Sequence, residues 1–134
     1  MPEKLMGLRV LLVEDSPVVA IATEGMLGDL GCVTVGPAGN MATALELAEK
    51  CEFDAAIIDI NIRGTKTFSL LKILDRRQIP YLISSGYADW TMPDELTDRP
   101  RLPKPFGAEL LRQKLTDLDV IQPLPPGGAS VPLP

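Results

Sequence analysis

The sequence predicts an α/β fold in which a doubly wound, five-stranded parallel sheet carries helices on both faces. Three observations lead to this prediction. Short apolar runs alternate with longer amphipathic segments, as they do in βαβ units. Two of the runs, Leu8 to Val13 and Ala55 to Asp59, are almost continuously apolar, as expected for strands covered on both faces. The chain has 134 residues, a length that suits one domain.

Five strands are predicted, each from an apolar run that ends in charged or turn-forming residues. In chain order they are Leu8 to Val13, Cys32 to Val35, Ala55 to Asp59, Tyr81 to Ser84, and Arg99 to Pro103.

Helices are predicted between the strands from capping residues and from apolar positions three and four residues apart. The first helix begins with the N-cap and first-turn pair Ser16-Pro17, runs to about Leu30 and is closed by Gly31. The second predicted helix has apolar residues at helical spacing from Met41 to Ala48. A third is predicted around Phe68 to Arg76, and a fourth from about Ala108 to Leu118. Residues 88–96 hold Pro93 and show little periodicity, so any helix there is short or distorted.

The predicted domain covers residues 1–121, and the Pro- and Gly-rich residues 122–134 are predicted to be a disordered tail. No apolar run approaches the roughly 20 residues that a membrane helix needs, so no membrane association is expected. The N-terminus shows no secretion signal, and we therefore expect a cytoplasmic protein.

Composition excludes several classes of function. The formal net charge of −5 argues against direct nucleic-acid binding, which usually needs a basic face. The chain has no histidine, so histidine cannot serve as a general base or carry a phosphoryl group here. Cys32 and Cys51 lack neighbouring metal ligands and are expected to be small buried residues in a reducing compartment.

Four charged residues follow the ends of predicted strands. Glu14 and Asp15 follow the first strand, Asp59 ends the third, and Lys104 follows the fifth. Because the carboxyl ends of parallel strands meet at one edge of the sheet, the three acids are expected to converge there. Crowded carboxylates favour a bound cation, and Mg²⁺ suits carboxylates together with phosphate oxygens. The pattern indicates phosphoryl chemistry, with Asp59 as the candidate nucleophile.

Each of these residues also has an ordinary structural interpretation. Asp15 alone could cap the first helix, although Glu14 beside it would then be superfluous. Asp59 alone could be a turn residue at a strand end. Lys104 could be a solvated lysine, but a proline on each side favours a fixed loop. The functional interpretation depends on all four positions occurring in order.

The chain resembles the receiver domain of two-component response regulators over about residues 5 to 120. The resemblance rests on four short motifs, which are Val13-Glu14-Asp15-Ser16, Ile58-Asp59, Ser84-Ser85-Gly86 and Lys104-Pro105-Phe106. It implies the flavodoxin-like strand order 2-1-3-4-5. It also implies a cis peptide bond between Lys104 and Pro105, which only a bond to proline adopts at modest cost.

The resemblance assigns a role to each site residue. Glu14 and Asp15 would hold Mg²⁺, and Asp59 would accept the phosphoryl group while also contacting the metal. The backbone carbonyl of Asn61, two residues later, would be a further metal ligand. Lys104 would pair with the phosphoryl group, and the hydroxyl of Ser85 would bind it. Ser84, the neighbouring hydroxyl, remains the alternative to Ser85.

The sequence departs from the common receiver pattern at the switch. Most receivers have an aromatic residue three positions before the lysine, whereas this chain has Arg101. The Gly-Tyr pair at residues 86–87 resembles an alphaproteobacterial subgroup that lacks this aromatic. Tyr87 and Trp90 are candidate partner contacts, although a Trp is more often part of the core.

The resemblance implies a stand-alone receiver that takes phosphate from a sensor histidine kinase or a histidine phosphotransfer protein. It would signal to a downstream protein and catalyse only its own phosphorylation and dephosphorylation, and a homodimer is left open. Two rival functions remain. The first is an Mg²⁺-dependent aspartyl-phosphate hydrolase. Such enzymes have an Asp-x-Asp motif at the nucleophile strand, whereas this chain has Asn61 in place of the second aspartate. The second is an interaction module that is never phosphorylated. No Gly-rich loop supports flavin or nucleotide binding.

Overall fold

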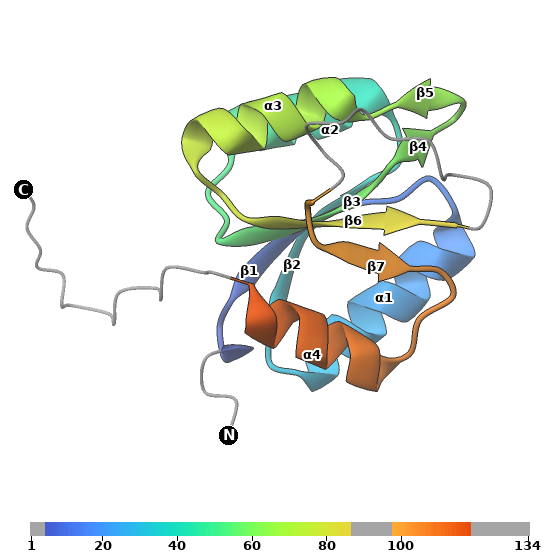
Figure 1. The fold of residues 1–134 in the computed structure, drawn as a ribbon, viewed down its shortest axis with the longest axis vertical. Coiled ribbons are helices and arrows are strands. Elements are labelled where there is room, and N and C mark those ends of the chain that lie inside the picture. Colours follow the sequence, from blue (N-terminus) through green and yellow to red (C-terminus); the bar gives the residue numbers. More distant parts are fainter. Residues whose placement is uncertain (1–4, 87–97, 119–134) are drawn as a thin grey trace, which may run out of the picture.

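A computed structural model of the chain describes residues 5–86 and 98–118. Within these residues the chain forms short strands and four helices, shown in chain order in Figure 1. The strands are β1 (Arg9–Val13), β2 (Val33–Ala38), β3 (Ala55–Asp59), β4 (Asn61–Ile62), β5 (Thr65–Lys66), β6 (Tyr81–Ser85) and β7 (Arg101–Pro103). The helices are α1 (Pro17–Asp29), α2 (Met41–Lys50), α3 (Phe68–Arg77) and α4 (Ala108–Asp117).

Five of the strands form one parallel sheet in the order β2-β1-β3-β6-β7. This confirms the predicted order 2-1-3-4-5, because β6 and β7 are the fourth and fifth of the predicted strands. The two remaining strands, β4 and β5, pair with each other in antiparallel orientation and form a separate small hairpin. The sequence did not predict this hairpin.

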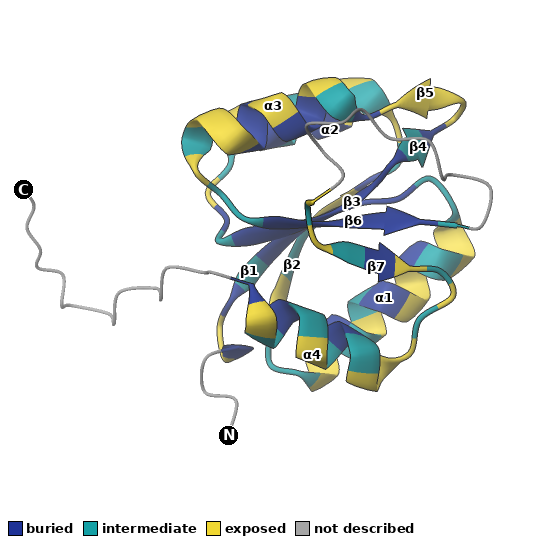
Figure 2. Ribbon diagram, in the orientation of Figure 1, coloured by how far each residue is buried: buried dark blue, intermediate teal, exposed yellow. Residues whose placement is uncertain are grey.

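Helices α2 and α3 cover one face of the sheet, and α1 and α4 cover the other (Figure 1). Because successive side chains of a strand point to opposite faces, each central strand contributes to two cores. In β3, Ile58 packs on the side of α2 and α3, whereas Ile57 packs on the side of α1 and α4. Figure 2 shows β3 and β6 buried along their length. Each buried Ile or Leu contributes about 1.5 to 3 kcal/mol, so the positions of these strands are well fixed.

The ends of the first two helices follow from local sequence. The Ser16 hydroxyl accepts a hydrogen bond from the Val19 amide (3.4 Å), as predicted for an N-cap. Gly31 follows the end of α1 with a φ of 87°, a conformation that glycine adopts readily. Asn40 caps α2 through its side-chain oxygen, which accepts from the Thr43 amide at 2.9 Å.

The observed strand boundaries differ from the predicted ones at prolines. Strand β2 continues past Val35 to Ala38, through the cis Gly36-Pro37 bond, because an edge strand tolerates a proline. Strand β7 begins at Arg101 rather than Arg99, after Pro100, which has no amide proton to donate to the sheet. Cys32 is buried as predicted, whereas Cys51 is only half-buried.

Several predicted features lie outside the described residues. They are the distorted segment 88–96, the partner contacts Tyr87 and Trp90, and the tail 122–134. Among the described helices, none has the length and apolar character needed to cross a membrane.

Candidate functional site

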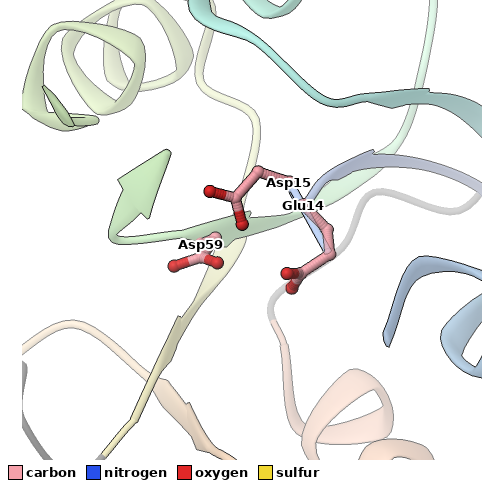
Figure 3. A group of neighbouring side chains, drawn as sticks. All are labelled: Glu14, Asp15 and Asp59. Carbon is pink, nitrogen blue, oxygen red and sulfur yellow. The ribbon is translucent and has the colours of Figure 1, made fainter. Parts of the chain in front are cut away.

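The register of the sheet brings the predicted acidic residues to one edge. Val13 lies beside Ile58 where β1 and β3 pair, so the residues that follow β1 come next to Asp59 at the end of β3. Figure 3 shows Glu14, Asp15 and Asp59 gathered at this edge. One oxygen from each of the three carboxylates lies within 4.8 Å of the others. The convergence that the sequence predicts is therefore present in the fold.

Lys104 lies directly against two of the three acids. Its Nζ donates to Asp59 Oδ2 at 2.8 Å and lies 3.0 Å from Glu14 Oε1. The Lys104-Pro105 bond is cis, as predicted. The Lys104 amide donates to the carbonyl of Ser85 at 2.9 Å, so the loop that carries the lysine is fixed to the end of β6. The lysine therefore bridges Glu14 and Asp59.

Burial and charge pairing act in opposite directions on these groups. Burial raises the pKa of Glu14, because it disfavours the ionised carboxylate more than the contacts with Lys104 and the Ser16 amide favour it. Burial lowers the pKa of Lys104, but hydrogen bonds to Asp59 and Glu14 outweigh this, and the pKa lies above its ordinary value. Lys104 is therefore protonated at neutral pH and supplies a fixed positive charge.

Backbone amides hold one oxygen of each carboxylate. The Ser16 amide donates to Glu14 Oε2 at 3.1 Å, and the Asn61 amide donates to Asp59 Oδ1 at 3.0 Å. The Arg63 amide donates to Asp15 Oδ2 at 2.7 Å, across 48 positions of sequence. These charge-assisted hydrogen bonds fix the orientation of each carboxylate.

The hairpin formed by β4 and β5 provides two of these amides. Its turn residues Arg63 and Gly64 both have positive φ, at 53° and 85°, as a two-residue turn of this type requires. The Gly64 amide donates to Asn61 Oδ1 at 2.9 Å, and Arg63 Nε donates to the carbonyl of Gly39 at 3.2 Å. Sequence reasoning missed Arg63. The signal that could have identified it was the Arg63-Gly64 pair, because a glycine in a short segment between two elements indicates a turn.

Sequence reasoning also missed Thr67, the residue that precedes α3. Its side chain is fully buried, and its hydroxyl donates to the backbone carbonyl of Asp59 at 2.7 Å. No local sequence pattern predicts this contact, because Asp59 and Thr67 lie on either side of the hairpin formed by β4 and β5.

The donor set fits a divalent cation that prefers oxygen ligands. Carboxylate oxygens are ligands that Mg²⁺ prefers in proteins. One oxygen from each of the three acids lies within 4.8 Å of the others, so the three carboxylates are close enough together to contact one ion. One lysine in contact with two of three acids leaves the cluster with excess negative charge, which a cation would offset. Glu14, Asp15 and Asp59 could hold the ion, with the Asn61 carbonyl as the further ligand predicted from the sequence.

The remaining predicted residues are placed less decisively. Ser84 and Ser85 are both buried at the end of β6, with Ser84 beside Asp59 in the register. Among the described residues, the Ser84 hydroxyl has no hydrogen-bond partner. Arg101 is half-buried in β7 beside Ile83. Both hydroxyls therefore lie at the end of β6, and Ser84 and Ser85 both remain candidates for the hydroxyl that binds the phosphoryl group.

Comparison with known proteins gives consistent results. The sequence model of the response regulator receiver domain matches residues 10–116. The sensor protein TorS of Escherichia coli K12 is 34% identical over 119 residues, which are 84% of this chain and 13% of TorS. The chemotaxis protein CheY-3 of Vibrio cholerae is 27% identical, with 81% of this chain and 89% of CheY-3 covered.

Solved structures show the same likeness. The solution structure of SdrG from Sphingomonas melonis Fr1 is similar with a TM-score of 0.75 and 34% identity, covering 84% of this chain and 95% of SdrG. A BeF3-activated conformation of SdrG has a TM-score of 0.70 and 33% identity, with 87% and 97% of the two chains covered.

Proposed function

The chain belongs to the response regulator receiver domain family of two-component signalling, and on that premise we propose that it accepts a phosphoryl group on Asp59. The donor is a sensor histidine kinase or a histidine phosphotransfer protein. The phosphorylated form signals by binding a downstream protein.

The observation that supports this proposal most directly is the environment of Asp59. Its side chain is 6% exposed, and Lys104 contacts Oδ2 while the Asn61 amide contacts Oδ1. Glu14 and Asp15 lie beside it. An aspartate with only a structural role needs a partner for its charge, but it does not need two further acids beside it.

The residues around Asp59 suit phosphoryl transfer. One carboxylate oxygen of Asp59 attacks the phosphorus of a phosphohistidine, and the phosphorus–nitrogen bond breaks. Its electron pair leaves with the imidazole, which takes up a proton from solvent. The product carries close to two negative charges on its phosphoryl oxygens, and Lys104 lies where it can offset part of that charge.

Metal binding belongs to the same proposal. Bound Mg²⁺ would supply charge neutralisation to the carboxylates and to the phosphoryl oxygens. Glu14, Asp15 and Asp59 present the carboxylates, and the amides of Ser16, Arg63 and Asn61 orient them. This orientation limits the movement needed at the moment of reaction.

The output is a change in protein binding. Ser85, at the end of β6, is proposed to donate a hydrogen bond to the phosphoryl group once it is present. The adjoining segment, with the candidate partner contacts Tyr87 and Trp90, lies outside the described residues. We place the protein in the cytoplasm and expect no catalysis beyond its own phosphorylation and dephosphorylation.

The hydrolase alternative is disfavoured by Asn61. A hydrolase of that kind would have a second acid at this position to protonate the leaving group, and an asparagine amide cannot act as one. The Asn61 side-chain oxygen is already an acceptor for the Gly64 amide. Release of inorganic phosphate from small phosphate esters would reveal such an activity.

The direct test is to incubate the protein with Mg²⁺ and acetyl phosphate and to measure its intact mass. Asp59→Asn should abolish the added phosphoryl mass, and a chelator should abolish it in the wild type. Asp54→Asn is the matched control, because Asp54 is a half-buried aspartate just before the opposite end of β3, and its side chain is 10% exposed. It should gain the same mass as the wild type.

A different result would disprove the assignment. If Asp59→Asn gained the acid-labile mass as fully as Asp54→Asn, the phosphoryl group would lie on another residue. If the wild type gained no mass with Mg²⁺ and the donor, the non-phosphorylated interaction module would be the better interpretation.

A further inference from the structure

Thr67 differs from the other capping-type residues that precede helices. Ser16 and Asn40 precede α1 and α2, and each caps its helix through its side chain. Thr67 occupies the same position before α3 but makes no side-chain cap. Threonine is a good capping residue, so a competing partner must hold its hydroxyl. That partner is the backbone carbonyl of Asp59, at 2.7 Å.

Thr67 makes a second contact with the same peptide segment. Its amide donates to the carbonyl of Ile60 at 3.0 Å. Two consecutive carbonyls, those of Asp59 and Ile60, therefore accept hydrogen bonds from one residue. The carbonyl of Thr67 itself accepts from the amides of Leu70 and Leu71 in the first turn of α3, at 3.0 and 3.3 Å. Thr67 thus lies between the end of β3 and the start of α3, and it is bonded to both.

We propose that Thr67 is a positioning residue that holds the Asp59 peptide for metal binding and couples its position to helix α3. This inference rests on the proposed function, in which Asp59 is the phosphoacceptor and a metal ligand. The hydroxyl fixes the Asp59 backbone, from which the carboxylate projects toward Glu14 and Asp15. Movement of the Asp59 peptide is transmitted to the first turn of α3 through the same residue.

The physical basis is the burial of this hydrogen bond. Thr67 is 0% exposed, so water cannot replace its hydroxyl at the Asp59 carbonyl. Loss of the hydroxyl would leave the peptide free to shift by fractions of an ångström. A metal site tolerates such shifts poorly, and groups that orient metal ligands typically change metal affinity about 10- to 100-fold when removed.

The chain offers a closely matched control in Thr23. Thr23 is 1% exposed, and its hydroxyl donates to the carbonyl of Val19 at 2.7 Å. It therefore has the same residue type, burial and bond length as Thr67, but it lies within α1. Thr67→Val and Thr23→Val remove the same group from similar surroundings, and only the first bond ends at the Asp59 peptide.

The experiment measures Mg²⁺ affinity by calorimetry for the wild type, Thr67→Val, Thr67→Ser and Thr23→Val. We expect Thr67→Val to weaken Mg²⁺ binding about tenfold. Thr67→Ser keeps the hydroxyl and should stay within about twofold of the wild type, as should Thr23→Val. Equal affinity in the two valine variants would overturn the proposal.

Coupling to α3 has its own measurement in the wild type, which does not require any variant to fold. Adding Mg²⁺ should shift the amide resonances of Leu70 and Leu71, and Thr67→Val should reduce those shifts. Unmoved resonances in the wild type would overturn the coupling. Intact mass after incubation with acetyl phosphate separates the role of Thr67 from the proposed function. If neither the wild type nor Thr23→Val gains phosphoryl mass, the proposed function is contradicted. Normal Mg²⁺ affinity in Thr67→Val contradicts only the role of Thr67.

Discussion

The two ends of the parallel sheet use similar charged residues in different ways. At the amino end, oppositely charged side chains form pairs: Arg9 holds Asp54 through its Nε and Nη2 atoms, at 3.1 and 2.9 Å. Nearby, Arg99 contacts both Asp75 and the hydroxyl of Tyr81. At the carboxyl end, one lysine faces three carboxylates.

The difference shows how a structural charge cluster is distinguished from a functional one. Matched pairs with side-chain hydrogen bonds satisfy each other, so the amino end needs no ligand. Unmatched acids held together by backbone amides cost stability, and this cost is understandable if the acids bind a cation and a phosphoryl group. Removing one member should therefore have opposite consequences at the two ends.

Lys104→Met should produce the largest effect. It removes the positive charge that contacts Asp59 and Glu14, and loss of one such charge-stabilising group typically slows a reaction about a hundredfold. We expect a decrease of this size in the rate of phosphorylation by acetyl phosphate with saturating Mg²⁺, followed by intact mass. Lys72→Met, at an exposed position of α3, is the control and should retain the wild-type rate. A normal rate in Lys104→Met would remove the lysine from the mechanism.

Asp15→Asn should separate stability from metal binding. The neutral side chain relieves repulsion within the cluster while its oxygen still accepts from the Arg63 amide. Without metal, the free energy of unfolding should rise by about 1 kcal/mol, whereas Mg²⁺ affinity should fall about tenfold or more. Urea unfolding with and without Mg²⁺ measures both quantities. A variant less stable than the wild type in the absence of Mg²⁺ would show that the acids are not in conflict.

The sequence predicted the central strands and the convergence of the four charged residues because both depend on local patterns. Strand β3 was predicted to the residue, since a continuous apolar run has only one place in a covered sheet. Two-residue strands such as β4 and β5 have no periodicity to detect. Strand β2 was predicted too short, because the Gly36-Pro37 pair indicates a turn unless the strand is known to lie at an edge.

The orienting groups of the site could not be predicted in the same way. The Arg63 amide reaches Asp15 across the fold, and a backbone donor leaves no mark in residue type. Thr67 has a side chain that suggests a helix cap, and only the position of the Asp59 carbonyl shows that it is used otherwise. Sequence patterns therefore indicated which groups carry charge, whereas the tertiary structure was needed to show what orients them.

Asp54→Asn should produce the smallest of these effects, confined to stability. Burial alone would raise the pKa of Asp54, but the hydrogen bonds from Arg9 outweigh it, and the pKa lies below its ordinary value of 3.8. A carboxylate with a lowered pKa stabilises the fold at pH values above that ordinary value, and its contribution is lost as the pH falls through the folded-state pKa. At neutral pH we expect a loss of about 1 to 2 kcal/mol, because asparagine accepts fewer of the three hydrogen bonds from Arg9. The difference from the wild type should shrink below about pH 3.8, as Asp54 itself becomes protonated.

Thermal unfolding between pH 2 and 7 measures this difference in stability, with Asp29→Asn at the exposed end of α1 as the control that should change little. A difference that does not depend on pH would mean that Asp54 stabilises the fold through packing rather than through its charge. The contrast between paired charges at one end of the sheet and unmatched acids at the other would then be wrong.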